Sequence, residues 1–366
     1  REFAGVGPQV ACQMQSIDEI RHAQTQVHAM SNYNKFYNGF KDFASQRDRI
    51  WYNSVPRSFF DDAMSAGPFE FLIAIGFSFE YVLTNLLFVP FMSGAAYNGD
   101  MATCTFGFSA QSDEARHMTL GLECIKFMLE QDPDNIPIVQ KWIDKWFWRG
   151  CRLLTLVAAM MDYMLPKRVM SWREAWNIYG VENGNALFRD LARYGIKPPM
   201  HWDDVEKSID HTSHQIMLGL YQWKFGTAFH SWTPTASDIE WLKEKYPTTF
   251  EKYYLPRWEY AIAQKEAGGE YNNFGLPKLC QVCQLPTLFS EPDDPTQLCH
   301  RETDYEGEKY HFCSDGCQHV FEQEPEKYVQ AWLPMTAMMQ EPLKGDLAAW
   351  MEWVSLEPTA AGEYAS

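Results

Sequence analysis

A pattern of charged residues that suits metal binding, Asp-Glu-x-Arg-His, occurs twice in this chain, beginning at Asp18 and at Asp113. On a helix, a glutamate and a histidine three residues apart project from one face, so each copy offers a carboxylate and an imidazole to the same point. Hard oxygen and borderline nitrogen donors suit iron or manganese. A single Glu-x-x-His is usually a solvent-facing pair, but the repetition favours a metal site. The predicted metal ligands in the two copies are Glu19, His22, Glu114 and His117.

A third carboxylate, Glu80, lies in a strongly apolar segment, where an unpaired buried charge would be costly. Glu80 and Glu114 each lie 17 residues from Tyr97, where a turn signal begins. In an antiparallel helical hairpin, this equal spacing brings both carboxylates to one level, about 25 Å from the turn. Helix bundles with two metal ions use two Glu-x-x-His pairs and a glutamate from each of two other helices. The hairpin partner of Glu19 would lie before the first residue, so we expect five of six ligands here and one missing glutamate.

The other charged residues of the two copies are candidates for orienting the ligands. We expect the aspartates to accept hydrogen bonds from the ligand imidazoles and so to fix their tautomer and orientation, with the arginines paired nearby. The alternative is that the aspartates are ordinary solvated acids. These residues are Asp18, Arg21, Asp113 and Arg116.

The elements that must position these groups are helices. From about residue 10 to 165 the chain favours helix and shows little strand alternation. Asp100 stands where the N-cap of the helix with the second motif is expected. Turn signals interrupt the pattern at residues 38–39, 66–68, 96–100, 132–133 and 166. We therefore predict a mainly all-α chain with a helical bundle over residues 1–166, a helical extension over 167–275, a Cys-rich module over 276–334, and a tail over 335–366 that starts helical and ends disordered.

The Cys-rich module carries a second candidate metal site. Cys280-x2-Cys283 and Cys313-x3-Cys317 form a pair-and-pair arrangement close to that of structural zinc sites, in which four thiolates complete a tetrahedron. The segment 310–328 resembles the YHS type of small metal-binding domain. A redox-active Cys280–Cys283 pair is an alternative, although no thioredoxin-like βαβ pattern surrounds it. Another alternative is that one zinc cysteine is replaced by Cys299, His300 or His311.

Composition limits the classes of function. The chain has 366 residues, of which 46 % are hydrophobic, enough for a large core and too many for general disorder. Its net charge of −17 repels phosphate backbones, so nucleic acid is not an expected partner. The apolar run 68–92 carries Glu70, Glu80 and Asn85, which favours a buried helix over a membrane span. The first residues show no secretory signal, and we expect an internal fragment of a longer cytoplasmic polypeptide with no membrane partner.

These motifs together resemble those of the large (α) subunit of bacterial multicomponent monooxygenase hydroxylases, most closely the phenol hydroxylases. The resemblance covers nearly the whole chain and is carried by residues 17–28, 79–100 and 111–118. It implies a ferritin-like bundle with a carboxylate-bridged diiron centre, of which the family's first glutamate ligand has no counterpart here. The implied ligands are Glu19 and His22 for one iron and Glu80, Glu114 and His117 for the other.

The resemblance also implies roles for residues near the metals. Thr84, four residues after Glu80, matches a threonine that is thought to assist proton delivery; the alternative is an ordinary carbonyl hydrogen bond by a buried threonine. Asn85 adjoins it and is assigned to the same proton or gating route. Gln111 matches an outer polar group, with a structural amide as the alternative. The candidate substrate-pocket residues, each of which could instead be plain core, are Phe59, Ile75, Phe77, Phe79, Phe88 and Phe106.

The implied chemistry is aromatic hydroxylation. Two ferrous ions reduce O2 together, one oxygen atom enters a small aromatic substrate, giving catechol from phenol, and the other leaves as water. The sequence shows no dinucleotide loop or flavin fingerprint. The resemblance therefore implies a separate reductase with NADH, FAD and a 2Fe–2S cluster, a small regulatory protein, and β and γ hydroxylase subunits. The rival interpretations are a toluene, benzene or alkene hydroxylase with the same ligands and, in another class, a ferritin-like iron-binding scaffold.

Overall fold

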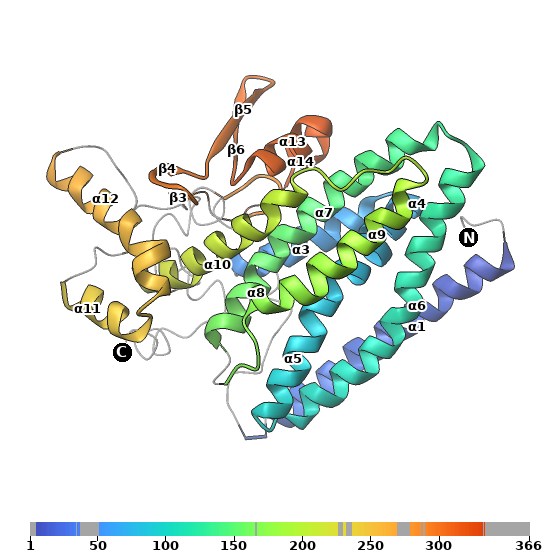
Figure 1. Ribbon diagram of the computed structural model, residues 1–366, viewed down its shortest axis with the longest axis horizontal. Coiled ribbons are helices and arrows are strands. Elements are labelled where there is room, and N and C mark those ends of the chain that lie inside the picture. Colours follow the sequence, from blue (N-terminus) through green and yellow to red (C-terminus); the bar gives the residue numbers. More distant parts are fainter. Residues whose placement is uncertain are drawn as a thin grey trace. The chain divides into compact units, whose positions relative to one another are not determined.

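The structure is a computed structural model of the chain, shown in Figure 1. It describes residues 5–33, 35–36, 51–164, 167–225, 230–231, 236–268, 279–285, 287, 290–331 and 333. The chain divides into two compact units, one with residues 1–42 and 60–206 and the other with residues 43–59 and 207–366. The tail predicted over 335–366 lies outside the described residues, as do the predicted boundaries at 166 and 275.

Long helices dominate the first unit, and the prediction of a mainly all-α chain is confirmed. Helices α1 and α6 lie side by side in Figure 1, and α5 and α6 form the hairpin expected from the turn signal near Tyr97. The bundle elements are α1 (Val6–Tyr33), α4 (Pro68–Leu72), the π-helix η1 (Ile73–Thr84), α5 (Asn85–Tyr97), α6 (Met101–Gln131), α7 (Asn135–Ala159) and the π-helix η2 (Met160–Met164), and α3 (Trp51–Ser65) spans the division between the units.

Local side-chain and backbone preferences determine where these helices begin. Asp100 accepts a hydrogen bond from the backbone N–H of Thr103 at 3.1 Å, so the predicted N-cap of α6 is confirmed. Gly99 has a φ of 82°, which the turn before α6 requires and which side chains with a Cβ rarely adopt. Ser171 and Glu174 form a capping box at the start of α8 (Trp172–Ala175).

Shorter elements complete the first unit and attach to α7 through aromatic rings. The ring of Trp202 lies 5.0 Å from that of Phe188 and 5.5 Å from that of Trp176. Phe188 in turn lies 5.4 Å from Phe147 of α7. Such edge-to-face and tilted ring pairs add to the free energy of apolar burial. These elements are η3 (Trp176–Val181), α9 (Glu182–Ala192) and the 3-10 helix η4 (Trp202–Asp204), and α10 (Val205–Gln222) begins at the division.

The apolar run 68–92 forms α4, η1 and α5, and its carboxylate at Glu70 is paired. Lys145 Nζ of α7 donates a hydrogen bond to Glu70 Oε1 at 3.0 Å, and the neighbouring Arg149 lies 3.2 Å from Asp62. Pairing removes much of the cost of burying these charges. Within the described ranges, no helix combines the length and the apolar content needed to cross a membrane.

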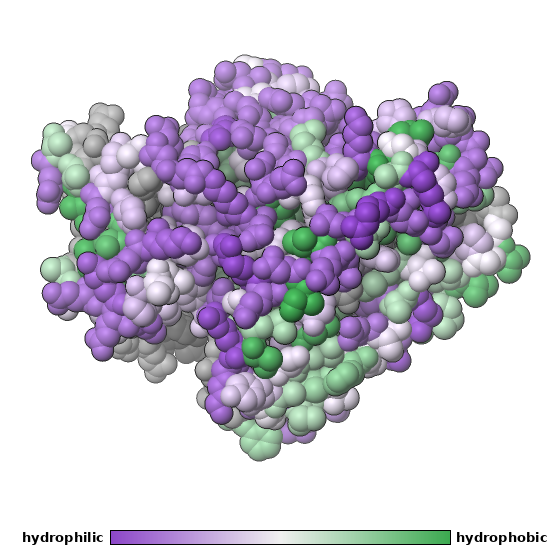
Figure 2. All heavy atoms as spheres, in the orientation of Figure 1, coloured by the Kyte–Doolittle hydropathy of each residue, from purple (hydrophilic) through white to green (hydrophobic). Residues whose placement is uncertain are grey.

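The space-filling view in Figure 2 shows mostly hydrophilic residues on the visible face. Hydrophobic residues gather there over the lower end of the bundle, where α5 turns into α6. Tyr97 and Met101, which flank this turn, are both exposed. Exposed apolar residues are common on the surfaces of folded proteins.

In the residues that the structure describes, the second unit combines helices with three short antiparallel hairpins. The Cys-rich module is built from the β5–β6 hairpin followed by α13, whose N-cap Ser314 accepts a hydrogen bond from the N–H of Cys317 at 3.3 Å. The elements are β1 (Trp223–Phe225), β2 (His230–Ser231), α11 (Ala236–Lys245), the π-helix η5 (Phe250–Tyr254), α12 (Leu255–Glu266), β3 (Ser290–Glu291), β4 (Asp294–Leu298), β5 (Arg301–Tyr305), β6 (Glu308–Phe312), α13 (Asp315–Gln323) and α14 (Pro325–Tyr328).

Candidate metal centre

Three helical elements bring the predicted ligands together inside the first unit. One carboxylate oxygen each of Glu19 on α1, Glu80 on η1 and Glu114 on α6, and a ring nitrogen of His117 on α6, all lie within 4.8 Å of one another. His22 of α1 borders this cluster, since its Nδ1 lies 3.6 Å from Glu19 Oε2 and 3.8 Å from Glu114 Oε1. The five predicted ligand side chains are therefore neighbours.

Two of the carboxylates extend between the two imidazoles. Glu19 presents Oε2 to His22 Nδ1 at 3.6 Å and Oε1 to His117 Nδ1 at 3.4 Å. Glu114 does the same, with Oε1 at 3.8 Å from His22 Nδ1 and Oε2 at 3.1 Å from His117 Nδ1. Glu80 approaches only one imidazole, with Oε1 at 3.5 Å from His117 Nδ1. This arrangement suits two metal positions, one near each imidazole, with Glu19 and Glu114 between them.

The aspartates of the two motifs hydrogen-bond to the imidazoles in a crossed arrangement. Asp113 Oδ2 lies 3.0 Å from His22 Nε2, and Asp18 Oδ2 lies 3.2 Å from His117 Nε2. Each motif thus supplies the aspartate that orients the histidine of the other. A carboxylate at Nε2 favours a proton on that nitrogen and leaves Nδ1, which faces the cluster of glutamates, as the nitrogen that can bind a metal.

The arginines of both motifs hold these aspartates in place. Arg116 Nη2 donates to Asp18 Oδ2 at 2.7 Å and to Asp113 Oδ1 at 2.8 Å. Arg21 forms an ion pair with Asp113 and lies 3.9 Å from Asp18. Burial acts to raise the pKa of Asp18, but hydrogen bonds and charge from Arg116 and His117 outweigh it and keep the pKa below its usual value. Asp18 is thereby held as a carboxylate that accepts hydrogen bonds.

The clustered glutamates are stabilised by positive charge, as the pKa values of the cluster indicate. Burial raises the pKa of Glu80 to about 7, and burial likewise raises the pKa of Glu19. Burial acts to lower the pKa of His117, but its hydrogen bonds to Glu114 and Glu80 outweigh this and raise the pKa to about 10. Among the described residues, Glu80 Oε2 is a buried oxygen without a hydrogen-bond partner. Converging carboxylates with an unsatisfied oxygen fit a metal cation, which would supply the charge that protons otherwise bring.

A close approach of two backbones positions Glu80 against α6. A Cβ atom on Gly121 would lie 2.6 Å from the backbone carbon of Gly76, and one on Gly76 would lie 3.0 Å from the carbonyl oxygen of His117. Any larger side chain would push η1 and α6 apart. Because Gly76 lies four residues before Glu80 and Gly121 four residues after His117, this contact brings the two ligands together.

One polar neighbour of the cluster, Gln15, was missed by the sequence analysis. Its Nε2 donates a hydrogen bond to Glu80 Oε1 at 3.3 Å, and the side chain is buried. Gln15 lies four residues before Glu19, so the two share one face of α1. That spacing was the available signal, because a buried glutamine one turn from a ligand is positioned to touch another ligand.

The residues assigned near the metals occupy different environments. Thr84 is buried, and its Oγ1 donates to the carbonyl oxygen of Phe79 at 3.3 Å. Thr84 and Glu80 both lie on η1, and because η1 is a π-helix the angle between their side chains differs from that on an α-helix; the role of Thr84 stays a prediction. Gln111 is half-buried on α6, and the side chain of Asn85 lies outside the part that the structure describes.

The predicted pocket residues fall into separate contacts. Phe106 lies 6.1 Å, ring to ring, from both His22 and Phe88, and so forms an apolar flank on the His22 side of the cluster. Phe77 is fully buried and lies 5.5 Å from Phe147 of α7. The other three are Phe79, which contacts Phe60, and the buried residues Ile75 and Phe59, of which Phe59 belongs to the second unit.

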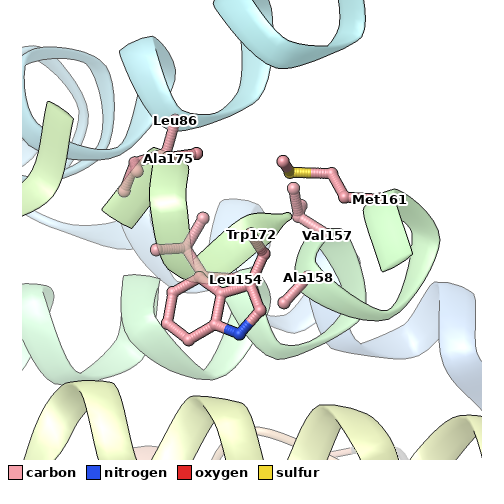
Figure 3. A pocket seen from close by; sticks show the side chains of 7 residues that line it. All are labelled: Leu86, Leu154, Val157, Ala158, Met161, Trp172 and Ala175. Carbon is pink, nitrogen blue, oxygen red and sulfur yellow. The ribbon is translucent and has the colours of Figure 1, made fainter. Parts of the chain in front are cut away.

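A small cavity of the first unit lies among other residues. Figure 3 shows apolar side chains from α5, α7, η2 and α8 that surround it. Its volume of about 10 Å³ is at the lower limit for one water molecule, far too small for an aromatic ring. The substrate pocket therefore stays a prediction. The lining residues are Leu86, Leu154, Val157, Ala158, Met161, Trp172 and Ala175.

In the second unit, four buried thiols form the other candidate metal site. One sulfur each of Cys280, Cys283, Cys313 and Cys317 lies within 4.8 Å of the others, and all four are free of disulfides. Cys283 Sγ lies 3.4 Å from Cys313 Sγ, which lies 3.8 Å from Cys317 Sγ. Four sulfurs this close together fit the donor set of a structural zinc site. Cys299 instead donates through Sγ to the carbonyl oxygen of Ser290 at 2.9 Å.

Comparison with known proteins gives matches to two family models. Residues 1–132 match the model described as Methane/Phenol/Alkene Hydroxylase, and residues 289–332 match the YHS domain. The chain is 63 % identical over 345 residues to the oxygenase component of a phenol 2-monooxygenase from Pseudomonas sp. (strain CF600), a match that covers 94 % of this chain and 67 % of the relative.

A more distant relative and a solved structure belong to the same group of hydroxylases. The chain is 32 % identical over 325 residues to the α subunit of the oxygenase component of an alkene monooxygenase system from Xanthobacter autotrophicus, covering 85 % of this chain and 63 % of the relative. It therefore spans about two thirds of the length of these curated relatives. A crystal structure of xenon-pressurized phenol hydroxylase from Pseudomonas sp. OX1 superposes with a TM-score of 0.83 at 60 % identity, covering 100 % of this chain and 76 % of that one. The predicted ferritin-like bundle with a Cys-rich module is confirmed.

Proposed function

The chain belongs to the methane/phenol/alkene hydroxylase family, and on this premise we propose that it is the catalytic subunit of a multicomponent monooxygenase that converts phenol to catechol with O2 and NADH-derived electrons. One observation carries the proposal: three carboxylates and two imidazoles meet inside the bundle, with one buried carboxylate oxygen left unsatisfied. A donor set of this composition suits two iron ions.

The geometry supports a division of the ligands between two irons. Glu19 and Glu114 would lie between the ions, His22 would bind one of them, and His117 and Glu80 would bind the other. A further glutamate, expected from the twofold pattern, completes the set. Two ferrous ions bound here supply the electrons and the Lewis acidity for the reduction of O2.

The outer residues prepare the ligands for this task. Asp18 and Asp113 would hold the two imidazoles with Nδ1 toward the ions, and Arg116 holds both aspartates in place through hydrogen bonds. Removal of such outer partners typically lowers metal affinity or activity about 10–100-fold. The aspartate of each motif thus orients the histidine of the other motif.

Thr84, Asn85 and Gln111 form the proposed route for protons. The Thr84 hydroxyl accepts and passes on protons consumed in oxygen reduction, and it can do so because its O–H rotates away from the Phe79 carbonyl. Thr84→Val should lower hydroxylation by up to about 100-fold with iron content unchanged. Thr119→Val, on the exposed face of α6, is the matched control. Equal activities of the two variants would remove Thr84 from the route.

The substrate chamber is proposed on the apolar side of the cluster. Phe88 and Phe106 exclude water near His22, which protects the reaction from competing solvent. The other predicted lining residues of the first unit, Ile75, Phe77 and Phe79, complete the apolar wall in this proposal.

The electron supply and the partners follow from the relatives, which are oxygenase components of monooxygenase systems. We propose a separate NADH reductase with FAD and a 2Fe–2S cluster, a small regulatory protein, and β and γ hydroxylase subunits. The four buried thiols of the Cys-rich module bind a structural zinc ion, and this ion holds the two cysteine segments together.

The test of this function is turnover by the full-length protein. Loaded with ferrous iron and mixed with its partner subunits, reductase and regulatory protein, it should bind two irons per chain and form catechol from phenol. An alkene and toluene serve as competing substrates, because the alkene monooxygenase relative shares this family. Preferred turnover of an alkene would replace the phenol assignment. Two irons with no hydroxylation of any substrate would instead support an iron-binding scaffold.

A further inference from the structure

The β5–β6 hairpin carries two imidazoles and a carboxylate that neither metal centre described above uses. One ligand atom each of His300, Glu302 and His311 lies within 4.8 Å of the others. His300 immediately precedes β5, and Glu302 on β5 is the direct cross-strand partner of His311 on β6. The antiparallel register therefore keeps these side chains together, since opposite residues have Cβ atoms about 5 Å apart.

The three ligand atoms are spaced as a tetrahedral metal site requires. His311 Nδ1 lies 2.9 Å from His300 Nε2 and 3.2 Å from Glu302 Oε1, and the remaining separation, between His300 Nε2 and Glu302 Oε1, is 3.6 Å. Metal–ligand bonds of about 2.0–2.1 Å in a tetrahedron separate neighbouring ligand atoms by about 3.3 Å. One ion can therefore contact all three atoms with only small adjustments of the side chains.

The carboxylate is already oriented toward the imidazoles. Lys309 Nζ donates to Glu302 Oε2 at 2.7 Å, so the other oxygen, Oε1, faces the two rings. Gln318 of α13 donates to the backbone carbonyl of Glu302 at 3.0 Å and ties the strand to the helix. The side chains of Glu302, His300 and His311 are 39 %, 24 % and 16 % exposed, so an ion can enter from solvent.

We propose that His300, Glu302 and His311 form a third metal site, for a divalent transition-metal ion, separate from the carboxylate–histidine centre and the four-thiol site. Two imidazoles and one carboxylate suit Zn²⁺, Ni²⁺ or Cu²⁺ and not Ca²⁺ or Mg²⁺. Three protein ligands leave the fourth position to water. The bound ion cross-links the two strands of a hairpin, an element that is marginally stable by itself.

The experiment counts zinc in the full chain by equilibrium dialysis against micromolar Zn²⁺, after the iron and four-thiol sites have been filled. The wild-type chain should retain one zinc more than His311→Ala, His300→Ala or Glu302→Gln. Each variant should bind the additional zinc at least about tenfold more weakly, since loss of a ligand costs no less than loss of an outer partner. His319→Ala and Glu308→Gln, in the same module and outside the cluster, are the matched controls and should retain the additional zinc.

Thiol-bound zinc and circular dichroism report whether each variant is folded. A histidine variant that also loses the thiol-bound zinc is not correctly folded and cannot test the site. Glu302→Gln is then the decisive variant, because glutamine keeps the shape of the side chain and removes only its charge. Loss of the additional zinc from a folded Glu302→Gln chain supports the site, and its retention overturns it. The proposal is also overturned if the wild-type chain takes up no additional zinc, or if the control variants lose it equally.

Discussion

The carboxylate–histidine centre of the first unit and the four-thiol site of the second collect their donors in opposite ways. The first draws side chains from α1, η1 and α6, which lie far apart in the sequence, and holds them with helix packing and crossed hydrogen bonds. The second takes its thiols from two short segments, 280–283 and 313–317, of a small module of hairpins and short helices. We expect helix packing to form the centre of the bundle without metal, and we expect the proposed zinc ion to contribute to the folding of the module.

The two sites also differ in how their charges are compensated in the absence of metal. In the bundle, arginines and aspartates already compensate one another, and His117 offsets part of the charge of the glutamates. In the module, burial raises the pKa of Cys280 and Cys283 well above the usual range, so these thiols are neutral until a metal displaces their protons. We expect the proposed zinc ion to add more to the stability of the module than iron adds to that of the bundle. The following variants test this contrast.

The largest expected effect comes from Glu114→Ala, which removes a carboxylate that faces both imidazoles. Iron binding, the diferric absorbance and hydroxylation should all be lost. The metal-free bundle should stay folded, because one source of repulsion among the buried carboxylates is gone. Glu123→Ala, exposed on the same helix, is the control. An unfolded metal-free variant would show that the bundle is not built in advance.

Cys313→Ser should remove the zinc and expose the Cys-rich module to proteolysis while the iron centre stays largely intact. The reason is that three thiols cannot close the tetrahedral site around which the module folds. Zinc and iron contents and limited proteolysis measure the two effects separately. Cys299→Ser, whose thiol bonds to the Ser290 carbonyl, should keep its zinc. Equal loss of iron in Cys313→Ser and Glu114→Ala would contradict two independent sites.

Asp113→Asn should weaken iron binding about 10–100-fold without unfolding the bundle. The substitution removes the charged acceptor at His22 Nε2 and one of the anchors of Arg116. Iron titration against a competing chelator measures the affinity. Asp134→Asn, at the start of α7 with no side-chain capping bond, serves as the control. An unchanged affinity would mean that helix packing alone orients the imidazole.

The smallest expected effect, and one on the scaffold, comes from Gly121→Ala. An added methyl group meets the backbone of Gly76 and should destabilise the bundle by about 1–3 kcal/mol. Urea unfolding measures the change, with iron content as a second readout, because Glu80 and His117 are displaced together. Gly7→Ala on α1 meets no atom within 4 Å and should change stability by less than about 1 kcal/mol. Similar results for both variants would show that the two backbones are not in tight contact.

Much of the first unit follows from local sequence signals. The turn signals at 66–68, 96–100 and 132–133 coincide with helix ends, and Asp100 caps α6 as expected. The equal spacing of Glu80 and Glu114 from Tyr97 predicted that both would lie at one level, and their oxygens lie within 4.8 Å. These features follow from sequence because helix rise, capping and turn preferences act over a few residues.

Other features of the site were not accessible to that reasoning. The π-helical form of η1 changes the angle between Glu80 and Thr84, and no local rule applied to these residues predicts it. The four-residue spacing of Gln15 and Glu19 places both on one face of α1, but only the tertiary structure shows that Gln15 reaches Glu80. Both depend on how helices pack, which involves residues distant in the chain.

The amino-acid sequence by itself determined which residues carry chemistry and that they lie on helices, because donor type and one-turn spacing are local properties. Only the tertiary structure decided that each aspartate orients the histidine of the other motif, and which glutamates lie between the two imidazoles. The physical reason is that these pairings depend on the rotation and separation of α1, η1 and α6. Long-range packing, including the contact of Gly76 with Gly121, sets both quantities.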